Sequence, residues 1–226
     1  MRKSYFITAI DTDAGKSVVT GVLARYLKEK GVNVITQKMA QTGCVGLSED
    51  IERHRRIMDT PLFPEDRNGQ TCPYVFPFPA APQLSAELAG ETIRLEKIHE
   101  STVRLEETYD CVLTEGVGGL MVPVVDDLTV LDYMKEYPQS TILVTNGKLG
   151  SVNHTLLSLE VLKNHGIELV GMIYNNFIET DPAITADSLK TLRRYLLRYY
   201  PQAVLAELSR REPGAQVPDF FPLFSK

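Results

Sequence analysis

A chain of 226 residues in which 43% are hydrophobic has enough apolar material for one large core, and no Pro/Gly/Ser-rich linker divides it. A formal net charge of −5 argues against the basic surface that sequence-independent nucleic-acid binding requires. We therefore expect a single domain over residues 1–226 that binds no nucleic acid.

The sequence shows no membrane or export signal. No apolar stretch approaches the about 20 residues of a membrane span, and the N-terminus has no apolar signal region. The three cysteines, Cys44, Cys72 and Cys111, are odd in number and form no CxxC pair, so we expect free thiols. These features predict a cytoplasmic protein without a membrane partner.

The first recognisable motif spans residues 8–17. A strand-like run, residues 5–7, leads into a loop that ends in Gly15-Lys16-Ser17, and hydrophobic residues then recur at helical spacing as far as Gly31. This order is typical of a phosphate-binding loop, whose amides and helix dipole bind anionic oxygens. Lys16 would reach the β- and γ-phosphates, and Ser17 would offer a hydroxyl to Mg²⁺. Ala9 replaces the usual first glycine, so the alternative is an ordinary turn capped near Ser17.

The second strand, residues 32–37, leads to Lys38. Ligands bind at the carboxyl ends of parallel strands, so we expect Lys38 to lie near the γ-phosphate, free of a structural duty, and to hold an anionic acceptor. Asp50 opens a short helix over residues 51–58. Its basic run, residues 53–56, is more typical of a solvated helix face than of a binding patch. The proline-rich stretch 59–83 is long for a loop, which predicts a functional excursion.

Helical patterns over residues 84–89 and 95–108 precede a buried strand, residues 111–114, that ends at Glu115 and a glycine-rich turn. A carboxylate in this place can orient Mg²⁺, and glycines let the backbone approach a phosphate. Asp50 and Glu115 would complete the oxygen ligands of a cation bound to Ser17. A plain glycine turn beside a solvated Glu115 is the alternative.

The C-terminal half continues the alternation of strand and helix. A helix over 128–137 and a strand over 141–145 precede a helix start at Gly150 and Ser151, where free N–H groups can bind a carboxylate. Ser151 is equally readable as a simple N-cap. The strand 169–174 ends at Asn175 and Asn176, which can read a base or form a turn. The guanine-reading Asn-Lys-x-Asp pattern is absent there, which favours adenine.

The remaining segments complete the predicted fold. A helix over 182–200 and a strand over 203–208 precede an aromatic tail, residues 220–224, which we expect to dock on the protein or on a partner subunit. The whole pattern predicts an α/β fold like that of P-loop NTPases, with a mostly parallel, doubly wound sheet and helices on both faces. Seven candidate residues fall just after predicted strands and so share one sheet edge: Lys16, Ser17, Lys38, Glu115, Gly118, Gly150 and Asn175. The four histidines are scattered, and we interpret them as surface or capping residues: His54, His99, His154 and His165.

Five motifs in this order and spacing resemble those of the dethiobiotin synthetases, ATP-dependent enzymes of biotin biosynthesis. The resemblance extends to about residue 176. The motifs lie at residues 5–17, 37–43, 48–50, 115–119 and 148–154.

This resemblance implies conversion of 7,8-diaminononanoate, CO₂ (or bicarbonate) and MgATP to dethiobiotin, ADP and phosphate. The reaction would pass through a carbamate and its phosphorylated anhydride. The same resemblance implies a homodimer with the substrate near the interface.

The resemblance also implies roles for individual residues. Lys16 and Lys38 correspond to the catalytic lysines that hold phosphate and carbamate, and Ser17, Asp50 and Glu115 to the Mg²⁺ ligands. Substrate contacts fall on Thr42 and, from the partner subunit, on the segment Gly150, Ser151, Val152 and Asn153. ATP contacts fall on Asp13, Ala14, Gly15, Lys16, Ser17, Val18, Asp50, Glu115, Gly116, Val117, Gly118, Asn175 and Asn176.

The chain departs from the family pattern at four places, and two rival functions stay open. Ala9 replaces the first loop glycine, Asp13 the usual Glu, and Met39 a Pro. Residues 206–209 lack the second base-binding segment Gly-x-Ile-Pro, which leaves base selectivity open. One rival is a related ATP-dependent ligase or amidoligase with another substrate. The other is a regulatory ATPase switch, which would carry an extra lysine where this chain has Asp11.

Overall fold

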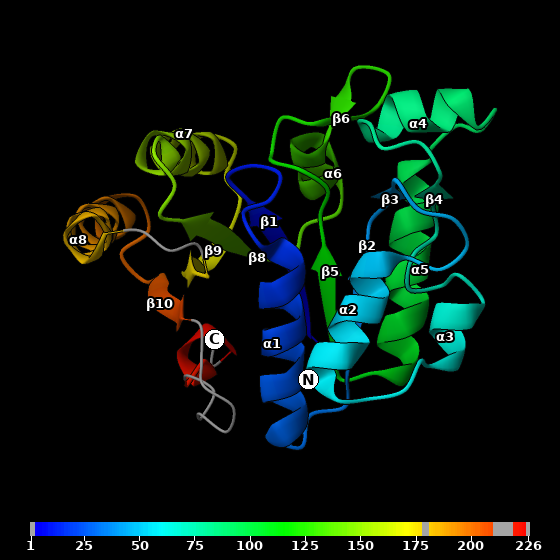
Figure 1. The fold of residues 1–226 in the computed structure, drawn as a ribbon, viewed down its shortest axis with the longest axis horizontal. Coiled ribbons are helices and arrows are strands. Elements are labelled where there is room, and N and C mark those ends of the chain that lie inside the picture. The colour runs from blue at the N-terminus through cyan, green and yellow to red at the C-terminus, as the bar shows by residue number, and fades with distance from the viewer. Residues whose placement is uncertain (1–2, 178–180, 210–218, 225–226) are drawn as a thin grey trace.

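The structure is a computed structural model that describes residues 3–177, 181–209 and 219–224. Its centre is a six-stranded sheet in which every pairing is parallel and the strand order is β10-β9-β8-β1-β5-β2 (Figure 1). The strands are β1 (Lys3–Ala9), β2 (Val34–Lys38), β5 (Cys111–Glu115), β8 (Ser140–Asn146), β9 (Leu169–Asn176) and β10 (Val204–Ser209). The predicted parallel sheet is therefore confirmed.

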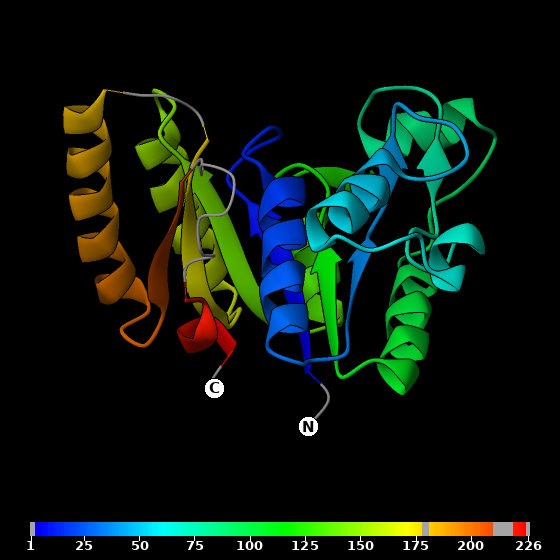
Figure 2. The same cartoon turned by 60° about the horizontal axis from the view of Figure 1, so that its bottom comes forward.

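Helices cover both faces of this sheet (Figures 1 and 2). One face carries α1 (Lys16–Glu29), α2 (Glu49–Met58) and the C-terminal turn α9 (Phe221–Phe224). The other carries α5 (Leu95–Thr108), α6 (Val130–Glu136), α7 (Ser151–Asn164) and α8 (Pro182–Tyr199). No helix among the described residues is both long enough and apolar enough to cross a membrane.

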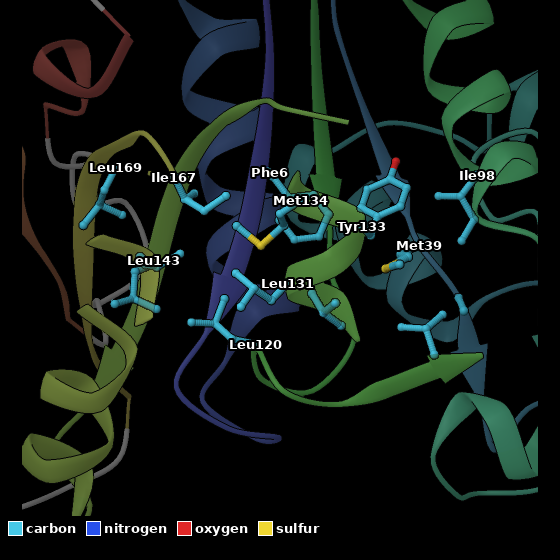
Figure 3. Packing of buried hydrophobic residues seen from close by; sticks show 14 of the residues in the cluster. Phe6, Met39, Ile98, Leu120, Leu131, Tyr133, Met134, Leu143, Ile167 and Leu169 are labelled. Carbon is cyan, nitrogen blue, oxygen red and sulfur yellow. The ribbon is translucent and has the colours of Figure 1, made fainter. Parts of the chain in front are cut away.

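Alternation along the strands supplies the two cores. In β1, Phe6 belongs to the cluster under α5, α6 and α7, whereas Tyr5 and Ile7 belong to the cluster under α1. Figure 3 shows the first cluster, in which Phe6, Leu131 and Met134 gather between the sheet and α6. Each such fully buried side chain stabilises the fold by about 1.5–3 kcal/mol.

The predicted long elements all exist, with ends shifted by one or two residues. The structure adds short elements that the sequence pattern does not reveal, because they are too short to show a period. They are β3 (Gln41–Thr42) paired with β4 (Val75–Phe76), α3 (Pro64–Arg67) and the hairpin β6 (Pro123–Val125) and β7 (Leu128–Thr129). The helix α4 (Pro82–Leu88) matches the one expected near residue 84.

The aromatic tail docks on its own chain, which confirms one of the two expected partners. Phe220 and Leu223 are buried, and the Phe220 ring meets Tyr26 of α1 edge-on, with centroids 5.5 Å apart. Leu223 lies so close to Gly171 that a Cβ there would meet its Cδ2 at 2.1 Å. The tail therefore completes the core beneath β9. Residues 210–218, which precede it in the chain, lie outside the described residues.

The basic run in α2 is only partly a solvated face, and this expectation is wrong for two of its residues. Arg53 and Arg56 are exposed, but His54 and Arg55 are buried. Arg55 forms a two-pronged ion pair with Asp66, with Nε–Oδ2 and Nη2–Oδ1 distances of 2.8 and 2.7 Å. Asp66 also accepts hydrogen bonds from Thr71 Oγ1 and the Phe63 amide. This pair therefore anchors residues 63–71 onto α2.

We predict that Asp66→Leu destabilises the fold by about 3–5 kcal/mol, because it leaves the Arg55 charge buried without a partner. The double variant Arg55→Met/Asp66→Leu should recover much of this loss, since it removes both buried charges of the pair. Urea unfolding followed by circular dichroism measures both effects.

A matched control is the exposed pair Arg25 and Glu29, whose side chains are 48% and 49% exposed. Glu29→Leu should change the free energy of unfolding by only about 0–1 kcal/mol. Equal losses from Asp66→Leu and Glu29→Leu would show that the buried pair has no special structural role.

Candidate functional site

The carboxyl ends of β1, β2 and β5 meet at one sheet edge, toward which the β2 and β5 arrows point in Figure 2. A cleft of about 670 Å³ lies there, lined by Thr12, Asp13, Gly15, Lys16, Ser17, Lys38, Ala40, Gln41, Thr42, Asp50, Arg53, residues 79–82, Glu115, Val117, Gly118 and Val122. Another cleft, of about 640 Å³, lies at the amino ends of the strands, away from the glycine-rich loops. The first cleft is the candidate site because the predicted residues converge on it.

The loop between β1 and α1 has the geometry of a phosphate-binding loop. Asp13 and Gly15 line the cleft and adopt left-handed backbone conformations, with φ of 57° and 95°. Such conformations let successive N–H groups converge on an anion. Gly15 is the N-cap of α1 and has no side chain to cap it, so the helix N-terminus stays open to an anion. Ser17 lies inside the helix and donates to Asp50 Oδ1 at 2.6 Å, so the alternative of a simple cap is wrong.

Lys16 lies across this loop. Its Nζ donates to the carbonyl oxygens of Gly118 and Asp11, at 2.7 and 3.1 Å. Burial, and next the charge of Lys38, lower the pKa of Lys16 from 10.5 to about 8. No carboxylate of the described residues forms an ion pair with it. Lys16 is therefore a desolvated cation whose partners are neutral carbonyls, which suits it to an incoming anion.

Lys38 lies at the end of β2, as predicted, but it is not free of structural partners as expected. Its Nζ lies 2.8 Å from both Asp50 Oδ2 and Glu115 Oε1. Burial opposes the charge, yet the two carboxylates outweigh it and raise the pKa of Lys38 above its ordinary value. Burial likewise opposes ionisation of Glu115, but the Lys38 ammonium and a hydrogen bond from His54 hold its pKa well below the usual range. Both groups are therefore charged at neutral pH.

Three oxygen-bearing side chains meet beside Lys38. The Ser17 hydroxyl lies 2.6 Å from Asp50 Oδ1 and 3.0 Å from Glu115 Oε1. Among the described residues, no group of three or more His, Cys, Asp or Glu side chains could hold a metal ion by itself. One hydroxyl and two carboxylates fit a hard cation such as Mg²⁺, which keeps several water or phosphate ligands rather than an all-protein cage. The donor set present is thus suitable for a metal bound together with a phosphate ligand.

The remaining predicted residues lie around or outside this cleft. Asn175 is buried at the end of β9, where its Nδ2 donates to the Ala14 carbonyl at 3.0 Å and its Oδ1 accepts from the Phe177 amide at 3.2 Å. It therefore braces the phosphate-binding loop. Ala14, Val18, Gly116 and Asn176 do not line the cleft.

The start of α7 also lies outside the cleft of its own chain. Gly150 occupies the N-cap position with φ of 90°, and no side chain caps the helix. The interpretation of Ser151 as a simple N-cap is therefore wrong. The Ser151 amide donates to the Lys148 carbonyl at 2.9 Å, so the amides of Val152 and Asn153 are the ones left for an anion. The carboxylate-binding interpretation stays a prediction.

Sequence reasoning missed several residues of the site. Arg53 lines the cleft and lies one helical turn from Asp50. Residues three apart are neighbours on a helix, so this spacing in the sequence could have indicated that Arg53 lies near Asp50. Residues 79–82 also line the cleft, which agrees with a functional excursion in 59–83. His54 is fully buried and its Nε2 lies 2.7 Å from Glu115 Oε2, so its interpretation as a surface or capping residue is wrong. Its spacing of four residues from Asp50 was the signal.

Comparison with known proteins agrees with this geometry. A family model described as an AAA domain matches residues 3–215. The ATP-dependent dethiobiotin synthetase BioD 2 of Pasteurella multocida is 50% identical over 204 residues, which cover 90% of this chain and 96% of the relative. The ATP-dependent dethiobiotin synthetase BioD of Chlorobaculum tepidum is 46% identical over 213 residues, 92% and 89% of the two chains. Among solved structures, a ParA family ATPase from Chlorobium tepidum matches 93% of this chain, and the match covers 84% of that structure. The TM-score is 0.55 and the sequence identity is 14%, so this similarity is one of fold.

We predict that Gly15→Ala weakens ATP binding by roughly ten- to a hundredfold, because displaced loop amides no longer meet the phosphates. A Cβ at Gly15 would lie 2.0 Å from Asn175 Nδ2, so either the loop or its brace must move. Isothermal titration calorimetry with ATP measures the loss.

Gly31→Ala is the matched control, because Gly31 also has a positive φ but its Cβ would meet nothing within 4 Å. It should cost about 1–3 kcal/mol of stability through backbone strain while ATP affinity stays unchanged. If both variants weakened ATP binding equally, the contact between Gly15 and Asn175 would not be what shapes the loop.

Proposed function

The chain belongs to the family of ATP-dependent dethiobiotin synthetases, and we propose that it converts 7,8-diaminononanoate, CO₂ and ATP to dethiobiotin, ADP and phosphate. The observation that carries this proposal is the site itself. Two buried lysines, Lys16 and Lys38, lie beside the hydroxyl and two carboxylates of Ser17, Asp50 and Glu115, at the mouth of a phosphate-binding loop. Such a site can neutralise a triphosphate and an anionic acceptor together.

The reaction needs three balanced steps. A substrate amine attacks CO₂ and loses a proton, which gives a carbamate. A carbamate oxygen then attacks the γ-phosphorus of ATP while the bond to the leaving ADP oxygen breaks, which gives a carbamic-phosphoric anhydride. The second amine attacks the carbonyl carbon, loses a proton and expels phosphate, which closes the ureido ring. No protein nucleophile is required, so positioning and charge neutralisation are the main contributions of the chain.

We assign the side chains of the cleft to these steps by their surroundings. Lys16, which has only carbonyl partners, would hold the β- and γ-phosphate oxygens. Lys38 would hold the carbamate and the charge that develops in transfer. Thr42 lies in the same cleft and would contact the substrate. Ala14, Val18, Gly116, Asn175 and Asn176 are assigned to nucleotide binding only through the family resemblance.

Mg²⁺ would be held by Ser17, Asp50 and Glu115. When bound, it would supply charge neutralisation between the phosphate oxygens. The support is the convergence of two carboxylate oxygens, one from Asp50 and one from Glu115, within 3.0 Å of the Ser17 hydroxyl on the cleft wall. Lys38 contacts the same two carboxylates, so this lysine and the cation would share them.

A second copy of the chain would complete the substrate site. Gly150, Ser151, Val152 and Asn153 form the open N-terminus of α7, yet they do not line the cleft of their own chain. In a homodimer this turn would reach the partner's cleft and bind the substrate carboxylate through its N–H groups. The 14-residue length of α7 gives the helix dipole its full effect at that end.

A mass-spectrometric assay tests the function. The purified protein is incubated with MgATP, ¹³C-bicarbonate and 7,8-diaminononanoate, and ADP and product mass are followed together. Labelled dethiobiotin that forms in step with ADP supports the proposal. ADP without labelled product would favour a related ligase with another substrate or a regulatory ATPase, although Asp11 in place of a second loop lysine argues against the latter.

We predict that Lys38→Ala lowers turnover by about 10²–10³-fold, because a preorganised cation is lost from the acceptor side. ATP should still bind, since Lys16 and the loop amides remain. Steady-state rates and calorimetric ATP affinity give the two values.

Lys190→Ala is the control, because Lys190 is an exposed lysine on α8, far along the chain from the cleft residues. It should leave both values unchanged. Unharmed turnover in Lys38→Ala, or loss of ATP binding by a variant that is still folded, would contradict the assignment of Lys38 to the acceptor.

A further inference from the structure

Behind the cleft, four buried side chains form an unbroken line of hydrogen bonds. Arg55 Nη1 lies 2.7 Å from Thr36 Oγ1, Thr36 Oγ1 lies 3.0 Å from His54 Nδ1, and His54 Nε2 lies 2.7 Å from Glu115 Oε2. These residues come from α2, β2 and β5, and none is more than 2% exposed. We propose that His54 is a positioning residue, which holds the Glu115 carboxylate in place for the metal-nucleotide site.

The hydrogens at the two ends of this line can be assigned from chemistry. An arginine guanidinium only donates, so Thr36 Oγ1 accepts from Arg55. An ionised carboxylate only accepts, so His54 Nε2 donates its hydrogen to Glu115 Oε2. Between the two ends, Thr36 Oγ1 and His54 Nδ1 share one hydrogen bond of 3.0 Å.

The far end of the line is rigid. Arg55 is held by both oxygens of Asp66 and lies over the Phe63 ring, 4.7 Å from its centroid. It also donates to the Thr36 carbonyl at 3.4 Å. A fixed guanidinium therefore holds the Thr36 hydroxyl, and through it the position of the His54 ring.

The near end of the line determines how Glu115 faces the cleft. With Oε2 bound to His54, the other oxygen, Oε1, lies 2.8 Å from Lys38 Nζ and 3.0 Å from Ser17 Oγ. Without the histidine, Oε2 would be a buried anionic oxygen with no donor, and the carboxylate would be free to turn. Partners that orient ligand carboxylates in this way influence metal affinity although they never touch the metal.

His54 does not line the cleft, so it is not placed to touch the substrate or the nucleotide. Its role is therefore indirect, through Glu115. This inference rests on the proposed function only in taking Glu115 as a metal ligand. It does not depend on which amine or acid the enzyme uses.

The experiment measures binding of Mn²⁺, a paramagnetic substitute for Mg²⁺, to the full chain in the presence of ADP by electron paramagnetic resonance. His54→Leu removes the donor at similar size and should weaken Mn²⁺ binding by about 10–100-fold. His54→Gln carries an amide N–H that can replace Nε2, so it should bind Mn²⁺ within about threefold of the unaltered protein. A purely structural role for the ring would not produce this rescue.

Leu162→Ala is the control, because Leu162 is fully buried in α7, in the core on the other face of the sheet from α2. It should lower thermal stability while Mn²⁺ affinity stays unchanged. Equal weakening in His54→Leu and Leu162→Ala would overturn the proposal, as would unchanged Mn²⁺ affinity in His54→Leu. If His54→Leu does not fold, Thr36→Val breaks the same line one link earlier, and unchanged affinity there overturns the proposal.

The outcome is separable from that of the proposed function. Binding of Mn²⁺ with ADP requires neither the diamine nor CO₂. A protein that makes no dethiobiotin but loses Mn²⁺ affinity in His54→Leu would overturn the proposed function and support the positioning role. A protein that makes dethiobiotin and keeps full Mn²⁺ affinity in His54→Leu would support the proposed function and overturn the positioning role.

Discussion

The buried ammonium of Lys38 between two carboxylates is the interaction on which this site depends. A single buried ion costs several kcal/mol, and this cost is offset only when partners with good geometry surround it. Here the partners come from different elements, Glu115 from β5 and Asp50 from α2. The parallel register that sets Lys38 opposite Glu115 is therefore tied to the electrostatics as well as to the backbone hydrogen bonds. A shift of one residue would turn Lys38 toward the α5 face, where Gln37 now binds the Ile98 carbonyl.

The same constraint explains why polar residues of α2 make contacts of the site on two sides. Asp50, in its first turn, reaches the cleft, while His54 and Arg55, one turn later, face the sheet behind it. The stretch 59–83 contributes to the site at two separate places. Its first part brings Asp66 to Arg55 and so fixes the back of the site, and its last part, residues 79–82, lines the cleft.

The sequence was sufficient to predict the sheet, the phosphate-binding loop and the positions of Lys38 and Glu115, because these follow from strand periodicity and from the rule that parallel strands end at one edge. The sequence was insufficient where contacts between residues far apart in the chain decide which side chains are buried. Burial of Arg55 depends on Asp66 in a proline-rich segment, and burial of His54 depends on Glu115, 61 residues away. A charged run in a short helix has the composition of a solvated face unless those partners are known. The site roles of Asn175 and of the α7 start could be named from resemblance, but the contacts between Asn175 and Ala14 required coordinates.

The charges of the site explain how it can admit a highly charged ligand. Lys16 and Lys38 balance Asp50 and Glu115, so the four groups are neutral together, yet their pairing is uneven. Lys38 contacts both carboxylates, whereas Lys16 contacts only carbonyl oxygens. Asp50 and Glu115 would hold a divalent cation that accompanies a polyphosphate, and the cation would supply positive charge beside the phosphate oxygens. Lys16 and Lys38 would then hold the phosphate and the acceptor, so that no charge would be left without a partner in a desolvated cleft. His54 donates to the Glu115 oxygen that Lys38 does not use, and would keep this carboxylate oriented for that role.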